Sequence, residues 1–258
     1  MTQSLRRTAL AAALLGLVSV SALAQRGGYY GQSSNPRYDG RFMFARIKYR
    51  GYEHFAQEGP GWAHDYPRAE AHLMRIMKTI STLRPVFETT AMEGSNILAA
   101  DDPELFKYPV AYLSEPGGWH PTDSEVKALH NYLTKGGFII FDDFGGAEDW
   151  MNLAFIMGKV LPGSRILPLP QTHAIFDSFF KIDLNVLGRG GGAGSYRGVP
   201  EYHAIYQDND PKKRIIAVVN MNNDIGEYWE FSDQGFSPVP SNEAYKLGVN
   251  YLIYALTH

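Results

Sequence analysis

The chain has 258 residues, 45% of them hydrophobic, which is enough apolar material for one sizeable α/β core. The formal net charge is −3, and basic and acidic residues are interleaved, so the sequence does not show the basic stripe typical of nucleic-acid-binding proteins. The chain contains no cysteine, which excludes disulfides, thiolate nucleophiles and cysteine-ligated zinc or iron–sulfur sites. Any catalysis must use oxygen or nitrogen side chains.

Residues 1–24 have the three parts of a secretory signal peptide. Arg6 and Arg7 precede a nearly continuous apolar run over residues 9–22, and Ala22-Leu23-Ala24 fits the small-residue pattern of a cleavage site. This run is shorter than the roughly 20 residues that span a bilayer, which makes a retained anchor the weaker alternative. We therefore expect an exported protein, periplasmic or secreted, cleaved near Ala24. Both general secretion, which we favour, and twin-arginine export are open.

The segment after the signal peptide divides into a leader and a folded domain. Residues 25–41 are rich in Gly, Ser, Tyr and Asn with no apolar period, which predicts a flexible leader before a single α/β domain at residues 42–258. Alternation over residues 42–49 predicts a strand near a sheet edge. Apolar residues at helical spacing over residues 73–83 predict a helix that Pro85 ends.

The middle of the chain repeats this plan more clearly. Residues 109–114 predict a strand, and residues 122–125 form a capping box. The helix that follows has an apolar face through Leu133 and ends at Gly136-Gly137. Residues 138–141 are a continuous apolar run, typical of a parallel strand buried on both faces.

The remaining pattern completes an alternating α/β order. We expect a helix at residues 151–160, a buried strand at 214–219 and a final helix at 245–256. This order predicts a three-layer α/β fold with a doubly wound, mostly parallel, flavodoxin-like sheet. Glycine-rich residues 184–199 predict a long mobile loop. Residues 188–193 match the loose dinucleotide-binding pattern, but they do not open a helix after the first strand, so no nucleotide cofactor is expected.

Ligands of such sheets bind beyond the carboxyl ends of the strands, so polar residues there are the candidates for function. Asp142 and Asp143 follow the buried strand directly, and adjacent carboxylates can coordinate a cation or serve as acid and base. The alternative is that one of them caps the next helix while the other faces solvent.

Other candidates follow the neighbouring segments. Glu115, Trp119 and His120 place an acid, an aromatic surface and an imidazole after the preceding strand, unless they form a turn with an exposed tryptophan. His173 lies among apolar residues, where a hydrogen-bonded structural histidine is the alternative. If His120, His173 and the two aspartates converge, they would form a site suited to zinc, manganese or iron.

Two further polar groups carry weaker hypotheses. Asp65, Arg68 and Glu70 open the first helix, where carboxylates favour the helix dipole and Arg68 could bind an acidic ligand. The oxygen-bearing side chains of Asn220, Asn222, Asn223 and Asp224 follow the last strand and could bind a cation, although a turn is the simpler interpretation.

Several strings of the sequence together resemble DUF4159, a bacterial family of domains of unknown function. These strings are Asp65-Tyr66-Pro67-Arg68, residues 102–109, Gly136-Gly137-Phe138, Asp142-Asp143, residues 173–179, residues 223–226 with Trp229, and residues 248–257. The resemblance spans residues 42–258. It implies a fold like that of the class I glutamine amidotransferases and the trehalose-utilisation-like proteins, and no established activity. Those amidotransferases use a Cys, His, Glu triad, so their chemistry cannot be transferred to a chain without cysteine.

Two hypotheses of function remain. The first is a non-catalytic exported domain that binds a small molecule or a protein partner in the cell envelope, with tyrosines in irregular segments as candidate contacts. The second is an envelope hydrolase on a small or carbohydrate-like substrate, with divalent-metal assistance possible. Asp142 or Asp143 would then act as general base, and His173 or His120 as acid or metal ligand. The second hypothesis predicts that these groups reach one cavity.

Overall fold

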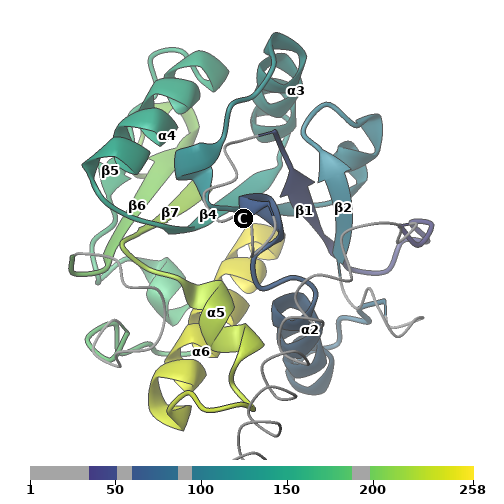
Figure 1. Cartoon of the computed structure of the whole chain (residues 1–258), viewed down its shortest axis with the longest axis vertical. Helices are drawn as coiled ribbons and strands as arrows, with labels where there is room; N and C mark the ends of the chain where they lie inside the picture. The colour runs from purple at the N-terminus through teal and green to yellow at the C-terminus, as the bar shows by residue number, and fades with distance from the viewer. Residues whose placement is uncertain (1–34, 51–59, 87–94, 188–197) are drawn as a thin grey trace, which may run out of the picture.

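A seven-stranded, mostly parallel sheet lies between two layers of helices (Figure 1). The structure is a computed structural model that describes residues 35–50, 60–86, 95–187 and 198–258. The strand order is β2-β1-β3-β4-β7-β6-β5. The strands are β1 (Phe44–Lys48), β2 (Ser95–Ala99), β3 (Val110–Ser114), β4 (Phe138–Phe144), β5 (Leu167–Pro168), β6 (Glu201–Tyr206) and β7 (Ile215–Met221).

The predicted doubly wound α/β fold is confirmed. Strands β2, β1, β3, β4 and β7 pair in parallel, whereas β6 and β5 continue the sheet as antiparallel strands. The chain passes from β1 to β2 on one side and then returns to β3 on the other side of β1. Connections that leave β1 and β3 therefore diverge at their carboxyl ends, which makes this the topological switch point of the sheet.

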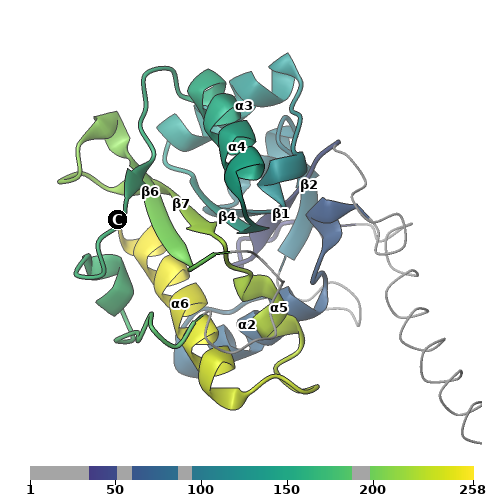
Figure 2. The same ribbon diagram turned by 60° about the vertical axis from the view of Figure 1, so that its left-hand side comes forward.

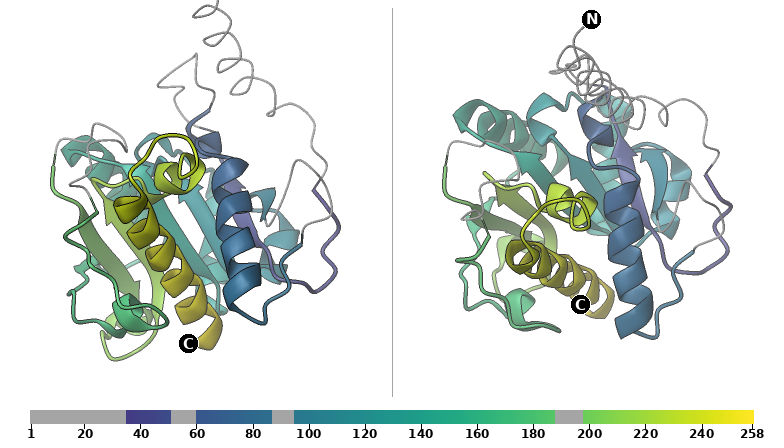
Figure 3. Two further views of the ribbon diagram at one scale, coloured as in Figure 1. Left: turned by 90° about the horizontal axis from the view of Figure 1, so that it is seen from below. Right: turned by 60° about the horizontal axis from the view of Figure 1, so that its bottom comes forward.

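Each face of the sheet is covered by its own helices (Figure 2). Helices α3 (Asp123–Thr134) and α4 (Ala147–Val160) pack on one face. Helices α2 (Arg68–Ile80), α5 (Ile225–Glu230) and α6 (Pro238–Thr257) pack on the other, where α2 and α6 lie side by side across the strands (Figure 3). Short 3-10 helices occupy the connections at Gly61–Ala63, Pro103–Lys107, Pro116–Gly118, Ala174–Asp177 and Gln207–Asn209.

Local sequence signals account for the best-predicted part of the fold. The capping box of α3 is confirmed, because the Thr122 amide donates to the Glu125 carboxylate at 2.7 Å and the Glu125 amide donates to the Thr122 hydroxyl at 3.3 Å. Every residue of β4 is buried, as expected for a strand covered on both faces. These two elements place the end of β4 next to the end of β3.

Part of the segment predicted as a leader contacts the sheet. The Asn35 side chain accepts a hydrogen bond from the Ile97 amide at 2.9 Å and donates to the Ile97 carbonyl at 2.7 Å, so it pairs with the outer edge of β2. Residues 1–34 and the glycine-rich part of the predicted loop, 188–197, lie outside the described residues. No helix among the residues that the structure describes is long and apolar enough to cross a membrane.

Candidate metal centre

Side chains from three connections and from the end of one strand meet at the carboxyl edge of the parallel strands. We call this cluster the acidic centre, and it consists of His64, Asp65, Glu115, Asp143 and Asp224. The first two lie between β1 and α2, Glu115 directly follows β3, Asp143 belongs to the end of β4, and Asp224 links β7 to α5. The centre therefore lies at the switch point, where doubly wound sheets bind their ligands.

One half of the acidic centre is built around an imidazole. Nδ1 of His64 lies 2.7 Å from Oε1 of Glu115 and 3.5 Å from Oδ2 of Asp143. The Ser114 hydroxyl donates to the same Asp143 oxygen at 3.1 Å. One potential ligand atom from each of His64, Glu115 and Asp143 lies within 4.8 Å of the others. These three residues form the histidine group.

The other half consists of carboxylates only. Asp65, Asp143 and Asp224 each offer an oxygen within 4.8 Å of the other two, and we call them the aspartate group. Asp224 also caps α5, because its carboxylate accepts a hydrogen bond from the Glu227 amide at 2.8 Å. Oδ2 of Asp65 is enclosed by protein and accepts no hydrogen bond from any described residue. An enclosed carboxylate oxygen without a donor is unfavourable unless a cation or proton meets it.

The backbone is distorted at three of these acids. Asp65, Glu115 and Asp143 have φ angles of 64°, 50° and 60°, in the left-handed region that L-residues seldom occupy. At Asp143 the distortion coincides with a register shift in the pairing of β4 with β7, a β-bulge that re-aims a side chain. Strain of this kind, of order 1–3 kcal/mol per residue, concentrates at functional sites.

Two glycines allow the main chain to approach the carboxylates closely. A Cβ atom at Gly226 would lie 2.6 Å from Oδ2 of Asp65, and one at Gly61 would lie 2.0 Å from Oε2 of Glu115. Larger residues at these positions would displace the acids. The glycines therefore belong to the construction of the site.

Burial and mutual repulsion perturb the acids of the centre. Burial raises the pKa of Asp65 well above its usual value, and the charge of Asp143 raises it further. The same causes, in the same order, raise the pKa of Asp224. Burial opposes charge on the His64 imidazole, but hydrogen bonds and charges from Asp143 and Glu115 outweigh it and raise the pKa of His64 to about 11. The metal-free centre thus retains protons that a cation would displace.

A buried ion pair holds the connection that carries His64 and Asp65. Nε of Arg46 donates to the Glu70 carboxylate at 2.6 Å, and both side chains are 1% exposed. Nη1 of Arg46 donates to the carbonyl of His64 at 3.1 Å. The guanidinium also lies 4.5 Å from the ring centre of Tyr112, a cation–π contact. Arg46 therefore fixes the backbone of the β1–α2 connection.

Asp142 is a positioning residue in this structure. Its Oδ2 accepts hydrogen bonds from the Tyr112 hydroxyl at 2.6 Å and from the amides of Ile225 and Gly226 at 3.0 and 3.1 Å. Its Oδ1 accepts from the Asn220 amide group at 3.0 Å. Burial raises the pKa of Asp142 to about 7, although these donors favour the charged form. Asp142 thereby anchors the start of α5, directly after Asp224.

The structure separates the other predicted candidates from the centre. His173 caps a short helix, and its ring lies 6.1 Å from that of Tyr254, which lies 6.3 Å from Phe138 at the opposite end of β4 from Asp143. His120 is exposed and belongs to neither ligand group. The predicted convergence of His120 and His173 with the two aspartates is therefore wrong: His120 follows β3 but lies outside both ligand groups, and His173 lies at the other end of the sheet, which order along the chain does not reveal.

Two predicted ligand-binding residues have structural partners. Trp119 is 0% exposed and packs against Phe141 at a ring distance of 6.0 Å, so the interpretation as an exposed tryptophan is wrong. Arg68 donates to the Asp233 carboxylate at 2.7 Å and to the Glu230 carbonyl at 3.3 Å. Asp65 and Glu115, also predicted to bind ligand, do belong to the acidic centre. Sequence reasoning missed His64, although its place in the connection between β1 and α2, next to Asp65, was a usable signal.

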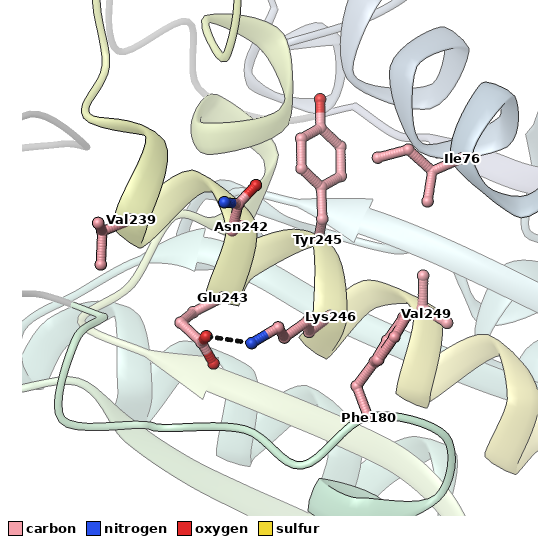
Figure 4. A pocket seen from close by; sticks show the side chains of 8 residues that line it. All are labelled: Ile76, Phe180, Val239, Asn242, Glu243, Tyr245, Lys246 and Val249. Carbon is pink, nitrogen blue, oxygen red and sulfur yellow. Dashed lines mark hydrogen bonds and ion pairs between the residues drawn. The ribbon is translucent and has the colours of Figure 1, made fainter. Parts of the chain in front are cut away.

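A pocket lies along α6 (Figure 4). It encloses about 350 Å³ and is lined by apolar side chains such as Ile76, Phe180 and Val249, beside the Glu243–Lys246 ion pair. It contains neither ligand group of the acidic centre. The acidic centre is therefore where this fold concentrates groups able to do chemistry.

Fold and site together define a doubly wound α/β domain with a carboxylate-rich centre at its switch point. Residues 43–256 match the family described as Domain of unknown function (DUF4159), and the chain belongs to that family. No curated protein matches the chain.

Proposed function

We propose that this domain binds a divalent cation at the aspartate group and uses the bound cation to hold a ligand rich in oxygen atoms. The observation that carries the proposal is the enclosed Oδ2 of Asp65, which lacks a hydrogen-bond donor beside Asp143 and Asp224, themselves only 4% and 5% exposed. A cation would neutralise these carboxylates where water cannot. An all-oxygen ligand set suits Mg²⁺, Ca²⁺ or Mn²⁺.

The same proposal includes the type of scaffold, the cellular location and the class of ligand. The scaffold is an amidotransferase-like one that lacks the catalytic cysteine, and it acts as a non-catalytic binding domain. The sequence of residues 1–24 supports export to the periplasm or beyond, where the ligand or partner would be met. Anionic small molecules and sugars are the ligand classes that a protein-bound cation can hold through oxygen.

The His64–Glu115 pair favours a second candidate function, a metal-assisted hydrolase. Nδ1 of His64 lies 2.7 Å from the Glu115 carboxylate, and both groups border the aspartate group through Asp143. A base at this place would take a proton from the water that attacks a substrate oriented by the cation.

Calorimetric titration of the purified protein with Mn²⁺ and with Ca²⁺ tests the cation site. Asp224→Asn should weaken binding by at least about tenfold, because it removes one charged ligand. The matched control Asp177→Asn changes an exposed aspartate outside the centre and should bind as the wild type does. Equal binding by wild type and Asp224→Asn would refute the site, provided that thermal unfolding shows both to be folded.

Turnover assays distinguish binding from hydrolysis. The Mn²⁺-loaded protein is incubated with p-nitrophenyl acetate, p-nitrophenyl phosphate and a p-nitrophenyl glycoside. Turnover that His64→Ala abolishes while Mn²⁺ stays bound would support the hydrolase and refute the non-catalytic proposal. The absence of turnover with a fully loaded protein would support the binding domain.

A further inference from the structure

We infer that the acidic centre holds a pair of divalent cations, one in the aspartate group and one in the histidine group, with Asp143 bridging them. This inference rests on the proposed function and deepens it, because it assigns a second metal site and a different donor chemistry. Asp143 is the residue that the two groups share.

The geometry of the shared residue carries the first step. Oδ2 of Asp143 lies 3.5 Å from Nδ1 of His64, while Asp143 also offers an oxygen within 4.8 Å of the ligand atoms of Asp65 and Asp224. A carboxylate has oxygens for both sides, and paired cations in proteins lie about 3.5–4 Å apart. The β-bulge and the positive φ of 60° at Asp143 hold its side chain between the groups.

The charge of the centre carries the second step. Four carboxylates and one imidazole meet there. The neighbouring guanidinium of Arg46 is already paired with Glu70 at 2.6 Å, so the His64 imidazole, in contact with Glu115 and Asp143, is left to offset part of the charge of the four acids. A single divalent cation offsets only half of their formal charge, whereas a pair offsets it completely with a neutral imidazole. Buried charge of one sign is costly in a low-dielectric environment, and this favours the pair.

The donor atoms carry the third step. The histidine group offers one nitrogen and carboxylate oxygens, a set suited to Mn²⁺, Zn²⁺ or Fe²⁺, while the aspartate group is all oxygen. Mn²⁺ suits both. Nε2 of His64 is enclosed and has no hydrogen-bond partner among the described residues, whereas Nδ1 faces Glu115 and Asp143. Nδ1 is therefore the nitrogen placed to bind a cation together with these two carboxylates.

Metal analysis and electron paramagnetic resonance of the Mn²⁺-loaded full chain test this inference. The wild type should retain about two Mn²⁺ ions per chain and show the exchange-broadened signal of coupled ions, because a bridging carboxylate places them about 4 Å apart. The double variant His64→Ala/Glu115→Gln should retain about one ion, with the resolved hyperfine signal of isolated Mn²⁺. The matched control His120→Ala/Glu104→Gln changes exposed residues outside both groups and should behave as the wild type does.

The outcomes separate the pair from the single site. About one uncoupled ion in the wild type would overturn the pair and leave the proposed cation site standing. No retained Mn²⁺ in the wild type would overturn both. Glu115→Gln alone, which keeps the shape of the side chain, serves as the second variant if the double variant fails to fold. Glu115→Gln should lose the signal of coupled Mn²⁺ ions. A coupled signal that persists in this variant would contradict the inference.

Discussion

Nδ1 of His64 lies 2.7 Å from Oε1 of Glu115, which joins the connection after β1 to the connection after β3. These connections leave the sheet in opposite directions because β1 and β3 flank the switch point. The contact therefore joins the two connections through a polar pair instead of apolar packing. A polar pair is less favourable for folding than apolar packing, but it offers groups that can bind a ligand. The first prediction concerns the cost to stability at Glu115.

Glu115→Gly should give a more stable protein than Glu115→Ala, by about 1–2 kcal/mol in the free energy of unfolding, because glycine accepts a left-handed backbone without penalty. The φ angle of Glu115 is 50°. Urea denaturation of the two variants measures the difference. Both variants should lose the carboxylate ligand equally, so their Mn²⁺ affinities should match. Equal stabilities would mean that the backbone at Glu115 is not strained.

Arg46→Met should lower the free energy of unfolding by about 3–5 kcal/mol, because it leaves the Glu70 carboxylate buried without a partner. Both side chains of this pair are 1% exposed. Arg46→Met combined with Glu70→Met should be less destabilised than Arg46→Met alone, since the uncompensated charge is gone. Urea denaturation checks both statements. An additive loss in the double variant would show that the pair is not coupled.

Asp142→Ala should accelerate exchange of the Ile225 and Gly226 amide hydrogens by at least about tenfold, because these amides lose their acceptor. They donate to Asp142 at 3.0 and 3.1 Å. Hydrogen exchange followed by nuclear magnetic resonance measures the change. Amides in the middle of α6 should keep their wild-type rates, which separates local release of α5 from general destabilisation. Unchanged exchange at Ile225 would contradict the anchoring role.

The metal-free protein should lose stability as pH rises. The pKa values of Asp65 and Asp224 are raised by burial and by neighbouring acids, that of Asp142 is raised to about 7, and that of His64 to about 11. The folded state therefore binds more protons than the unfolded state at pH values above the ordinary aspartate pKa of 3.8, which gives a negative slope of stability with pH.

Asp65→Asn removes one of these groups and should flatten that slope at pH values above the ordinary aspartate pKa of 3.8. Urea denaturation at several pH values measures it, with Asp177→Asn as the matched control. Cation binding should follow the opposite direction, with affinity rising as pH rises, because the cation displaces the protons. An unchanged slope in Asp65→Asn would show that Asp65 keeps no proton in the fold.

The core of the fold was predictable because its signals are local. The capping box at Thr122 and the apolar run at residues 138–141 identify α3 and β4 without reference to the rest of the chain. Strand β2 and the antiparallel strand β6 were missed. In β6, Glu201 is exposed and Tyr202 and His203 are only partly buried, so the buried run that marks a central strand is short.

The acidic centre was only partly predictable, for a geometric reason. Glu115, Asp143 and Asp224 were identified because they follow strands, and parallel strands bring their carboxyl ends to one edge, whereas Asp65 was identified only as a residue that opens the first helix. Arg46 alternates with apolar residues in the strand predicted at residues 42–49, a pattern typical of a solvent-facing position, yet it is 1% exposed. Its burial depends on Glu70 from the facing helix, a pairing that the sequence of either element alone does not contain. His173 was misplaced because its loop returns to the other end of the sheet.

Anomalous diffraction from crystals of the full chain grown with Mn²⁺ tests the central claim most directly. Data collected on the high-energy and low-energy sides of the manganese absorption edge give a difference map that locates the metal without reference to the protein atoms. We predict a peak among the carboxylates of Asp65, Asp143 and Asp224, with metal–oxygen distances of about 2.2 Å. A map without a peak at these residues, from crystals saturated with Mn²⁺, would contradict the account.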